Sequence, residues 1–75
     1  MTDINFRVRG YPMKEGEEFL RENFRTESEA TSFFEDLQTE EDNIVTATPY
    51  PSIVLALEEF YNGEWTVKCK RLVRK

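Results

Sequence analysis

The chain contains no histidine, and its 75 residues include a single cysteine, Cys69. A structural zinc site takes several Cys or His ligands, and a disulfide joins two cysteines, so this chain lacks the residues for either. The same absence excludes a nucleophile activated by histidine. We therefore expect no metal, no cofactor and no catalytic residues, and we interpret the chain as a protein that is not an enzyme.

Long apolar stretches are also missing. The longest, residues 53–57, is far below the roughly 18 residues that a membrane-spanning helix requires. Residues 1–5 have neither the basic segment nor the apolar segment of a secretory signal. These absences predict a cytoplasmic location and no association with a membrane.

The chain does contain enough apolar bulk for a core. Hydrophobic residues make up 39% of it and aromatic residues 13%, whereas disordered chains are poor in aromatic and β-branched residues. Domains shorter than about 50 residues rarely stand alone. We therefore expect residues 1–75 to fold as one domain.

Charge is distributed unevenly along the chain. The formal net charge is −5, but residues 16–64 hold 13 acidic and 2 basic side chains, while residues 65–75 hold 5 basic and no acidic ones. This pattern predicts an acidic body and a basic C-terminal strand.

The first third predicts two strands. Residues 4–9 alternate between apolar and polar, which is typical of a half-buried strand with Ile4, Phe6 and Val8 inward. We interpret residues 17–25 as a second strand with Leu20 and Phe24 inward, and a short helix over 17–23 stays open as the alternative. A hairpin through residues 14–16 would set Phe6 opposite Phe24.

The clearest local signal begins at Thr26. A Thr followed three residues later by Glu29, just before apolar residues, is a capping box at a helix start. Ala30, Phe33, Phe34 and Leu37 then follow at the spacing of one helical face. The sequence predicts an α-helix over about 27–39.

The middle of the chain is less decisive. Residues 40–42 are all acidic and would lie at the negative end of the predicted helix, where they are mildly unfavourable. Asn43 would supply a left-handed residue after the helix, and residues 44–48 are interpreted as a short strand. Because prolines do not fit a central strand, residues 49–51 mark either a turn between strands or a kink in one long edge strand.

The last third predicts a hairpin of residues 53–60 and 64–73. A two-residue turn at Asn62-Gly63 would pair Glu58 with Val67 and mix the two faces. A three-residue loop with Gly63 in a left-handed bulge instead pairs Leu57 with Val67, and we prefer it because it gives one apolar face. That face is Ile53, Leu55, Leu57, Val67 and a buried, inert Cys69; Lys68 and Lys70 would point outward with Val54, Ala56 and Glu58.

Together these elements predict an α+β fold of order β-β-α-β-β-β. An antiparallel sheet of four to five strands would carry one amphipathic helix on one face.

Acidic residues on and after the helix predict an interaction surface. They lie away from its apolar face, and the set comprises Glu29, Glu35, Asp36, Glu40, Glu41 and Asp42. We expect a small protein-interaction or regulatory module, such as an inhibitor or adaptor, that presents this surface to a basic protein partner. A homodimer through a sheet edge, or through a patch of Val54, Ala56 and Phe60, is compatible with this hypothesis.

The alternative hypothesis is a weak binder of single-stranded nucleic acid, using the basic C-terminal strand. Such proteins combine cations with aromatic side chains on which bases stack. The residues for this role are Tyr61, Trp65, Lys68, Lys70 and Arg71. A sequence pI near 4.7 argues against it, because nucleic-acid-binding domains are usually strongly basic.

Overall fold

Four strands and two helices follow one another in the order β-β-α-α-β-β. The computed structural model of the chain describes residues 4–14 and 16–75. Its elements are β1 (Phe6–Pro12), β2 (Leu20–Phe24), α1 (Glu27–Thr39), α2 (Glu41–Ala47), β3 (Ser52–Tyr61) and β4 (Glu64–Arg74). The strands form one antiparallel sheet in the order β2-β1-β3-β4. The predicted α+β class, with one long helix against the sheet, is confirmed.

The first hairpin follows the apolar alternation of its strands. β2 occupies Leu20–Phe24, so the strand interpretation of residues 17–25 is confirmed over the helix, although the strand is shorter than predicted. Phe6 lies opposite Phe24, as expected. Phe24 also packs against Phe33 of α1, with 5.2 Å between ring centroids. The predicted turn included Glu15, which lies outside the described residues.

Helix α1 begins where the capping box predicted. Thr26 accepts a hydrogen bond from the backbone N–H of Glu29 at 3.2 Å, and the Thr26 hydroxyl donates to the Glu29 carboxylate at 3.0 Å. The first of these bonds satisfies one of the N–H groups that the first helical turn leaves without a partner. Ala30 and Phe34 face the sheet and are buried.

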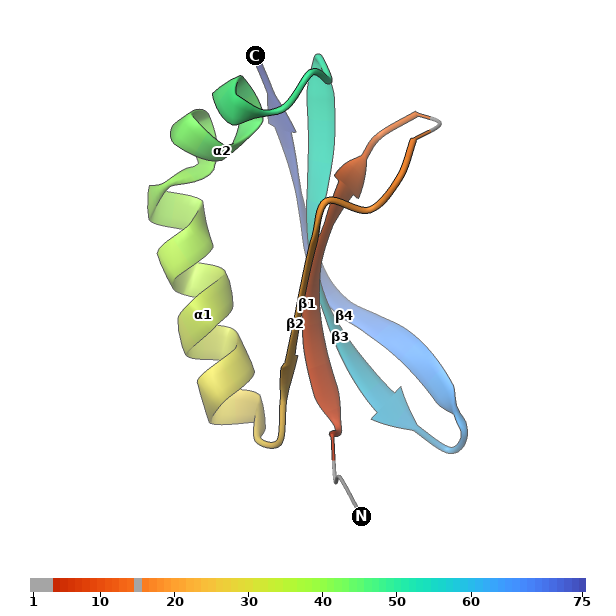
Figure 1. Cartoon of the computed structure of the whole chain (residues 1–75). Coiled ribbons are helices and arrows are strands. Elements are labelled where there is room, and N and C mark those ends of the chain that lie inside the picture. The colour runs from red at the N-terminus through yellow and green to blue at the C-terminus, as the bar shows by residue number, and fades with distance from the viewer. Residues whose placement is uncertain (1–3, 15) are drawn as a thin grey trace.

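The core lies between the sheet and the helices, which cover the same face of it (Figure 1). We call this side the helix face. Its buried members are Phe6, Val8, Ala30, Phe34, Val45, Ile53, Leu55, Leu57 and Val73. The other side, which we call the open face, is covered by no helix within the part of the chain that the structure describes.

Residues 41–47 form helix α2, so the predicted strand at 44–48 is wrong. Ile44 and Val45 favour strands locally, but burial of Val45 against the core outweighs that preference. Asn43 is likewise a residue inside α2 and ends no helix. Glu41 and Asp42 lie in the first turn of α2, where carboxylates are favourable, and not at an unfavourable helix end.

The connection from α2 to β3 settles the open question about residues 44–60. They are a helix, a short connection containing Pro49 and Pro51, and one strand. β3 lies at the centre of the sheet, between β1 and β4. Both prolines precede its first residue, Ser52, and so remove no hydrogen bond from its interior.

The second hairpin has the two-residue turn, and the preferred three-residue loop is wrong. Tyr61 pairs with Glu64, and Asn62 and Gly63 between them have φ of 53° and 83°, as a type I′ turn requires. Glu58 therefore lies opposite Val67.

A bulge resolves the mixing of faces that this turn implied. The register shifts between Leu57 and Glu58, so that Leu57 lies opposite Cys69 and Lys68 is the extra residue. Lys68 consequently turns toward the helix side, where it contacts Glu27, and does not point outward with Lys70.

Two members of the predicted buried set are exposed. Val67 lies on the open face and is 46% exposed. Cys69 is exposed although it pairs with buried Leu57, because β4 is an edge strand and the helices bury only its Val73. Within the described residues, no helix has the length and apolarity to cross a membrane.

Candidate functional site

The residues of the predicted acidic surface lie on α1, on α2 and at the junction between the two helices. α1 and α2 follow one another along one side of the sheet (Figure 1), and their sequence brings the six predicted carboxylates into one layer. Five are exposed and Glu41 is partly buried. We call Glu29, Glu35, Asp36, Glu40, Glu41 and Asp42 the acidic surface.

Three of these carboxylates already have partners within the chain. Arg71 of β4 forms an ion pair with Glu41 and donates a second hydrogen bond at 2.9 Å, and these bonds hold the pKa of the Glu41 carboxyl below its usual range. Glu29 belongs to the capping box, and Glu40 accepts a hydrogen bond from Asn43 at 3.0 Å. Glu41 is thus the member least available to a partner.

The remaining three carboxylates are not compensated. Within the described residues, no Lys or Arg nitrogen lies within 4.0 Å of Glu35, Asp36 or Asp42. No basic residue occupies the last turn of either helix. The helix layer therefore keeps an excess of negative charge at its solvent side.

The residues of the nucleic-acid hypothesis do not form one surface. Trp65 and Lys70 lie on the open face, by their pairing with Phe60 and Ala56. Lys68, by contrast, contacts Glu27 at 2.7 Å and Glu59 at 3.5 Å on the helix side, and its bond to Glu27 raises its pKa.

Of the other two members of that set, Arg71 lies on the helix side, since it pairs with Leu55. Arg71 is held by Glu41. Tyr61 is 72% exposed at the hairpin end. The basic C-terminal strand is thus divided between two faces.

The open face carries a network of ion pairs whose residues belong to neither predicted set of site residues. Glu58 of β3 accepts hydrogen bonds from Arg7 and Arg9 of β1. Arg9 also contacts Glu18 at 3.1 Å, and Arg21 of β2 donates to Glu18 at 2.8 and 2.7 Å. The signal was present, because inward Phe6 and Val8 require Arg7 and Arg9 to point to the other face.

Aromatic rings complete the covering of this face. The Arg7 guanidinium lies 4.0 Å from the Trp65 ring centroid, a cation–π contact, and Phe60 packs against Trp65 at 5.2 Å. Ala56 is fully buried and Glu58 is 4% exposed, although no helix lies over them. Of the predicted patch of Val54, Ala56 and Phe60, Ala56 is therefore not at the surface.

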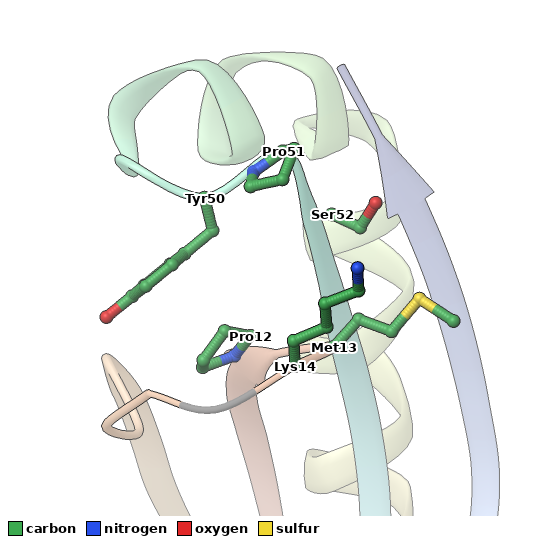
Figure 2. Close-up of a pocket in the computed structure, with 6 residues that line it drawn as sticks. All are labelled: Pro12, Met13, Lys14, Tyr50, Pro51 and Ser52. Carbon is green, nitrogen blue, oxygen red and sulfur yellow. The ribbon is translucent and has the colours of Figure 1, made fainter.

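Two shallow hollows lie where β1 ends and β3 begins. The first, of about 220 Å³, has Tyr50 and Pro51 on one side and Pro12, Met13 and Lys14 on the other (Figure 2). The second, of about 440 Å³, continues onto the open face and is lined by Tyr11, Met13, Val54, Lys70 and Leu72. Both are apolar with a lysine in the lining, and among the described residues no carboxylate lines either of them.

Comparisons with protein-family models, with curated proteins and with solved structures found no match for this chain. Across the described residues, no group of three or more Cys, Asp or Glu side chains is arranged to hold a metal ion. The candidate sites are therefore the surfaces described above.

Proposed function

We propose that this chain is a non-enzymatic protein-interaction module, of the inhibitor or adaptor kind, that presents its acidic surface to a basic region of a protein partner. The observation that supports this most directly is the set of uncompensated, exposed carboxylates Glu35, Asp36 and Asp42. Like charges held close together repel one another. A basic partner would relieve that repulsion on binding.

The distribution of cations supports the same proposal. On the open face Arg7, Arg9 and Arg21 are engaged with Glu58 and Glu18, so they do not neutralise the helix layer. A surface of one sign accelerates encounter with a partner of the opposite sign and disfavours wrong partners. Such a module would act by occupying the basic region of its partner.

Substitution of the uncompensated carboxylates tests the proposal. In the variant Glu35→Gln/Asp36→Asn/Asp42→Asn the fold should persist, because these side chains are exposed and no described cation forms an ion pair with them. A matched control, Glu17→Gln/Glu22→Gln/Glu64→Gln, removes three exposed charges that lie outside the acidic surface. Immobilised wild type, variant and control are each incubated with source-cell lysate, and the retained proteins are identified.

A protein retained by wild type and control but lost with the variant, and released at about 0.5 M salt where surface electrostatics is screened, supports the proposal. Retention of the same proteins by all three chains would show that the acidic surface does not bind the partner. The control separates a local effect from one of net charge.

The second candidate function is binding of single-stranded nucleic acid on the open face. Trp65, Tyr11 and Lys70 all lie on this face, and aromatic rings beside cations are the elements of such sites. Titration with a mixed-sequence oligonucleotide at about 50 mM salt, where phosphate contacts are strong, separates the two functions. Micromolar binding would favour the nucleic-acid function over a protein partner.

A further inference from the structure

The outer edge of β4 carries backbone groups that pair with no other strand among the described residues. β4 lies at the end of the sheet order, beside β3 alone. The backbone N–H of Lys75 donates to Pro51, and the register continues through Val73, Arg71 and Cys69 opposite β3. Because hydrogen bonding alternates along an antiparallel strand, the N–H and C=O groups of Lys70, Leu72 and Arg74 point away from the sheet.

The same three residues place their side chains on the open face. Leu72 pairs with Val54 and Lys70 with Ala56, and Leu72 is 43% exposed. Lys70 and Leu72 also line the second hollow, together with Tyr11, Met13 and Val54. The edge therefore combines free backbone groups, one apolar side chain in a hollow, and a cation on each side of that side chain.

We propose that this edge binds an extended, acidic segment of a partner protein by strand addition. Added strands gain affinity from main-chain hydrogen bonds and specificity from alternate side chains. A segment with Glu-x-Val-x-Glu spacing sets its acids beside Lys70 and Arg74 and its valine beside Leu72. Neither Lys70 nor Arg74 makes an ion pair within the part of the chain that the structure describes.

Charge complementarity selects this occupant over a second copy of the chain. Two β4 edges pairing with each other would oppose Lys68, Lys70, Arg71 and Arg74 to the same cations, and like charges across strands are destabilising. Lysine on an edge strand is a common protection against such self-pairing. The cations of this edge attract an acidic strand and repel the β4 strand of a second copy. This surface is separate from the acidic surface and of opposite charge, so the inference goes beyond the proposed function.

Amide hydrogen exchange with defined peptides tests the inference. The probe is the capped peptide Thr-Glu-Thr-Val-Thr-Glu-Thr, which reads the same in both directions and so fits a parallel or an antiparallel added strand. It should slow exchange at the amides of Lys70, Leu72 and Arg74, while the amides of Cys69, Arg71 and Val73 are already protected by β3. Two comparison peptides are used. One carries Lys in place of Glu, and the other carries N-methyl groups on the backbone donors that face β4.

Both comparison peptides should leave exchange unchanged, since one is repelled and the other lacks the hydrogen-bond donors. The variant Lys70→Glu/Arg74→Glu should weaken binding of the acidic peptide by at least about tenfold, because two attractive rim contacts become repulsive. The matched control Arg21→Glu/Arg25→Glu changes net charge equally, on and after β2 at the opposite edge of the sheet, and should keep binding.

Several results would overturn the inference. One is unchanged amide exchange with the acidic peptide at millimolar concentration, and another is binding of the N-methylated peptide as strong as that of the acidic peptide. A third is protection of the β4 amides that rises with protein concentration alone, which would assign the edge to a second copy. Protection by an oligonucleotide and not by the peptide would assign it to nucleic acid. The N-methylated peptide keeps the test valid even if the charge-reversed variant fails to fold, and none of these measurements involves Glu35, Asp36 or Asp42.

Discussion

Arg7 connects Glu58 to Trp65: its Nε donates to the Glu58 carboxylate while its guanidinium lies 4.0 Å from the centre of the Trp65 ring. Glu58 is 4% exposed on a sheet face that no helix covers within the described residues. Its burial is supplied by the side chains around it, since long arginine stems can cover apolar surface while their charged ends stay hydrated. Ion pairs therefore cover the centre of the open face, and exposed apolar side chains lie toward its ends.

Replacement of Glu58 should destabilise the fold. Glu58→Ala leaves Arg7 and Arg9, both partly buried, without their shared acceptor. A free-energy loss of about 1–3 kcal/mol is expected for a part-buried charged group that loses its partner. Denaturant unfolding measures it, and Glu64→Ala, at an exposed site, should stay within about 0.5 kcal/mol of wild type. Equal effects of the two substitutions would show that the network contributes nothing.

The capping box gives a second stability prediction. Thr26→Ala removes the oxygen that accepts from the Glu29 backbone N–H, and the free energy of unfolding should fall by about 0.5–2 kcal/mol. Ser28→Ala, inside the same first turn, is the control and should have little effect. A loss below about 0.3 kcal/mol for Thr26→Ala would mean that this hydrogen bond contributes less than an ordinary helix cap.

The sequence predicted the elements that depend on local signals. Thr26 and Glu29 lie three residues apart and fix the start of α1 wherever that helix packs. Asn62-Gly63 was an equally local signal for a two-residue turn. Continuous pairing from this turn would mix apolar and polar side chains on each face. A bulge at Lys68 shifts the register and restores Leu57 and Cys69 to the same face. Nothing in the identity of Lys68 marks it as the extra residue.

The errors that remain concern contacts between distant segments. Ile44 and Val45 favour a strand locally, whereas the segment is helical and buries Val45 in the core. The acidic surface followed from helix periodicity, but the pairing of Glu41 with Arg71 joins residues 30 positions apart. Ion pairs with Glu27 and Glu41, which are distant in sequence, likewise place Lys68 and Arg71 on the helix side, away from Trp65.

Exposure of Cys69 can be tested directly. The thiol lies on an edge strand beyond the cover of the helices, so an aromatic disulfide reagent should label it in the folded protein at a rate close to that in denaturant. Rates depend on access as well as on thiolate content. A thiol in the core would be labelled more than about a hundredfold more slowly in the folded protein than in denaturant. That result would show that Cys69 is buried.

The turn of the second hairpin predicts different effects on stability at its two residues. Gly63 has φ of 83°, and a Cβ there would meet no atom within 4 Å. Gly63→Ala should therefore cost about 1–2 kcal/mol from backbone conformation alone. Asn62→Gly, with φ of 53° at the native residue, should be close to neutral. Denaturant midpoints measure both, and a neutral Gly63→Ala would contradict the left-handed conformation.

Stability should fall in acid through two carboxylates. Hydrogen bonds from Arg21, and then from Arg9, lower the pKa of Glu18, and Arg71 lowers that of Glu41. A carboxyl whose pKa is lower in the folded than in the unfolded chain contributes stability that is complete above its unfolded pKa, about 4.3. That contribution disappears as the pH falls through the lower, folded pKa.

The gap in unfolding free energy between wild type and Glu18→Gln should therefore be constant from pH 7 to about pH 5.5 and close progressively below about pH 4.5. Glu41→Gln should behave in the same way, because a protonated carboxyl and an amide are both neutral. Urea unfolding at several pH values measures the gap, with Glu64→Gln as the control at an exposed site. Sodium chloride at about 1 M should narrow both gaps at pH 7, since the pairs are partly exposed. Gaps that stay the same from pH 7 to pH 3 would show that these arginines do not act on the carboxylates through charge.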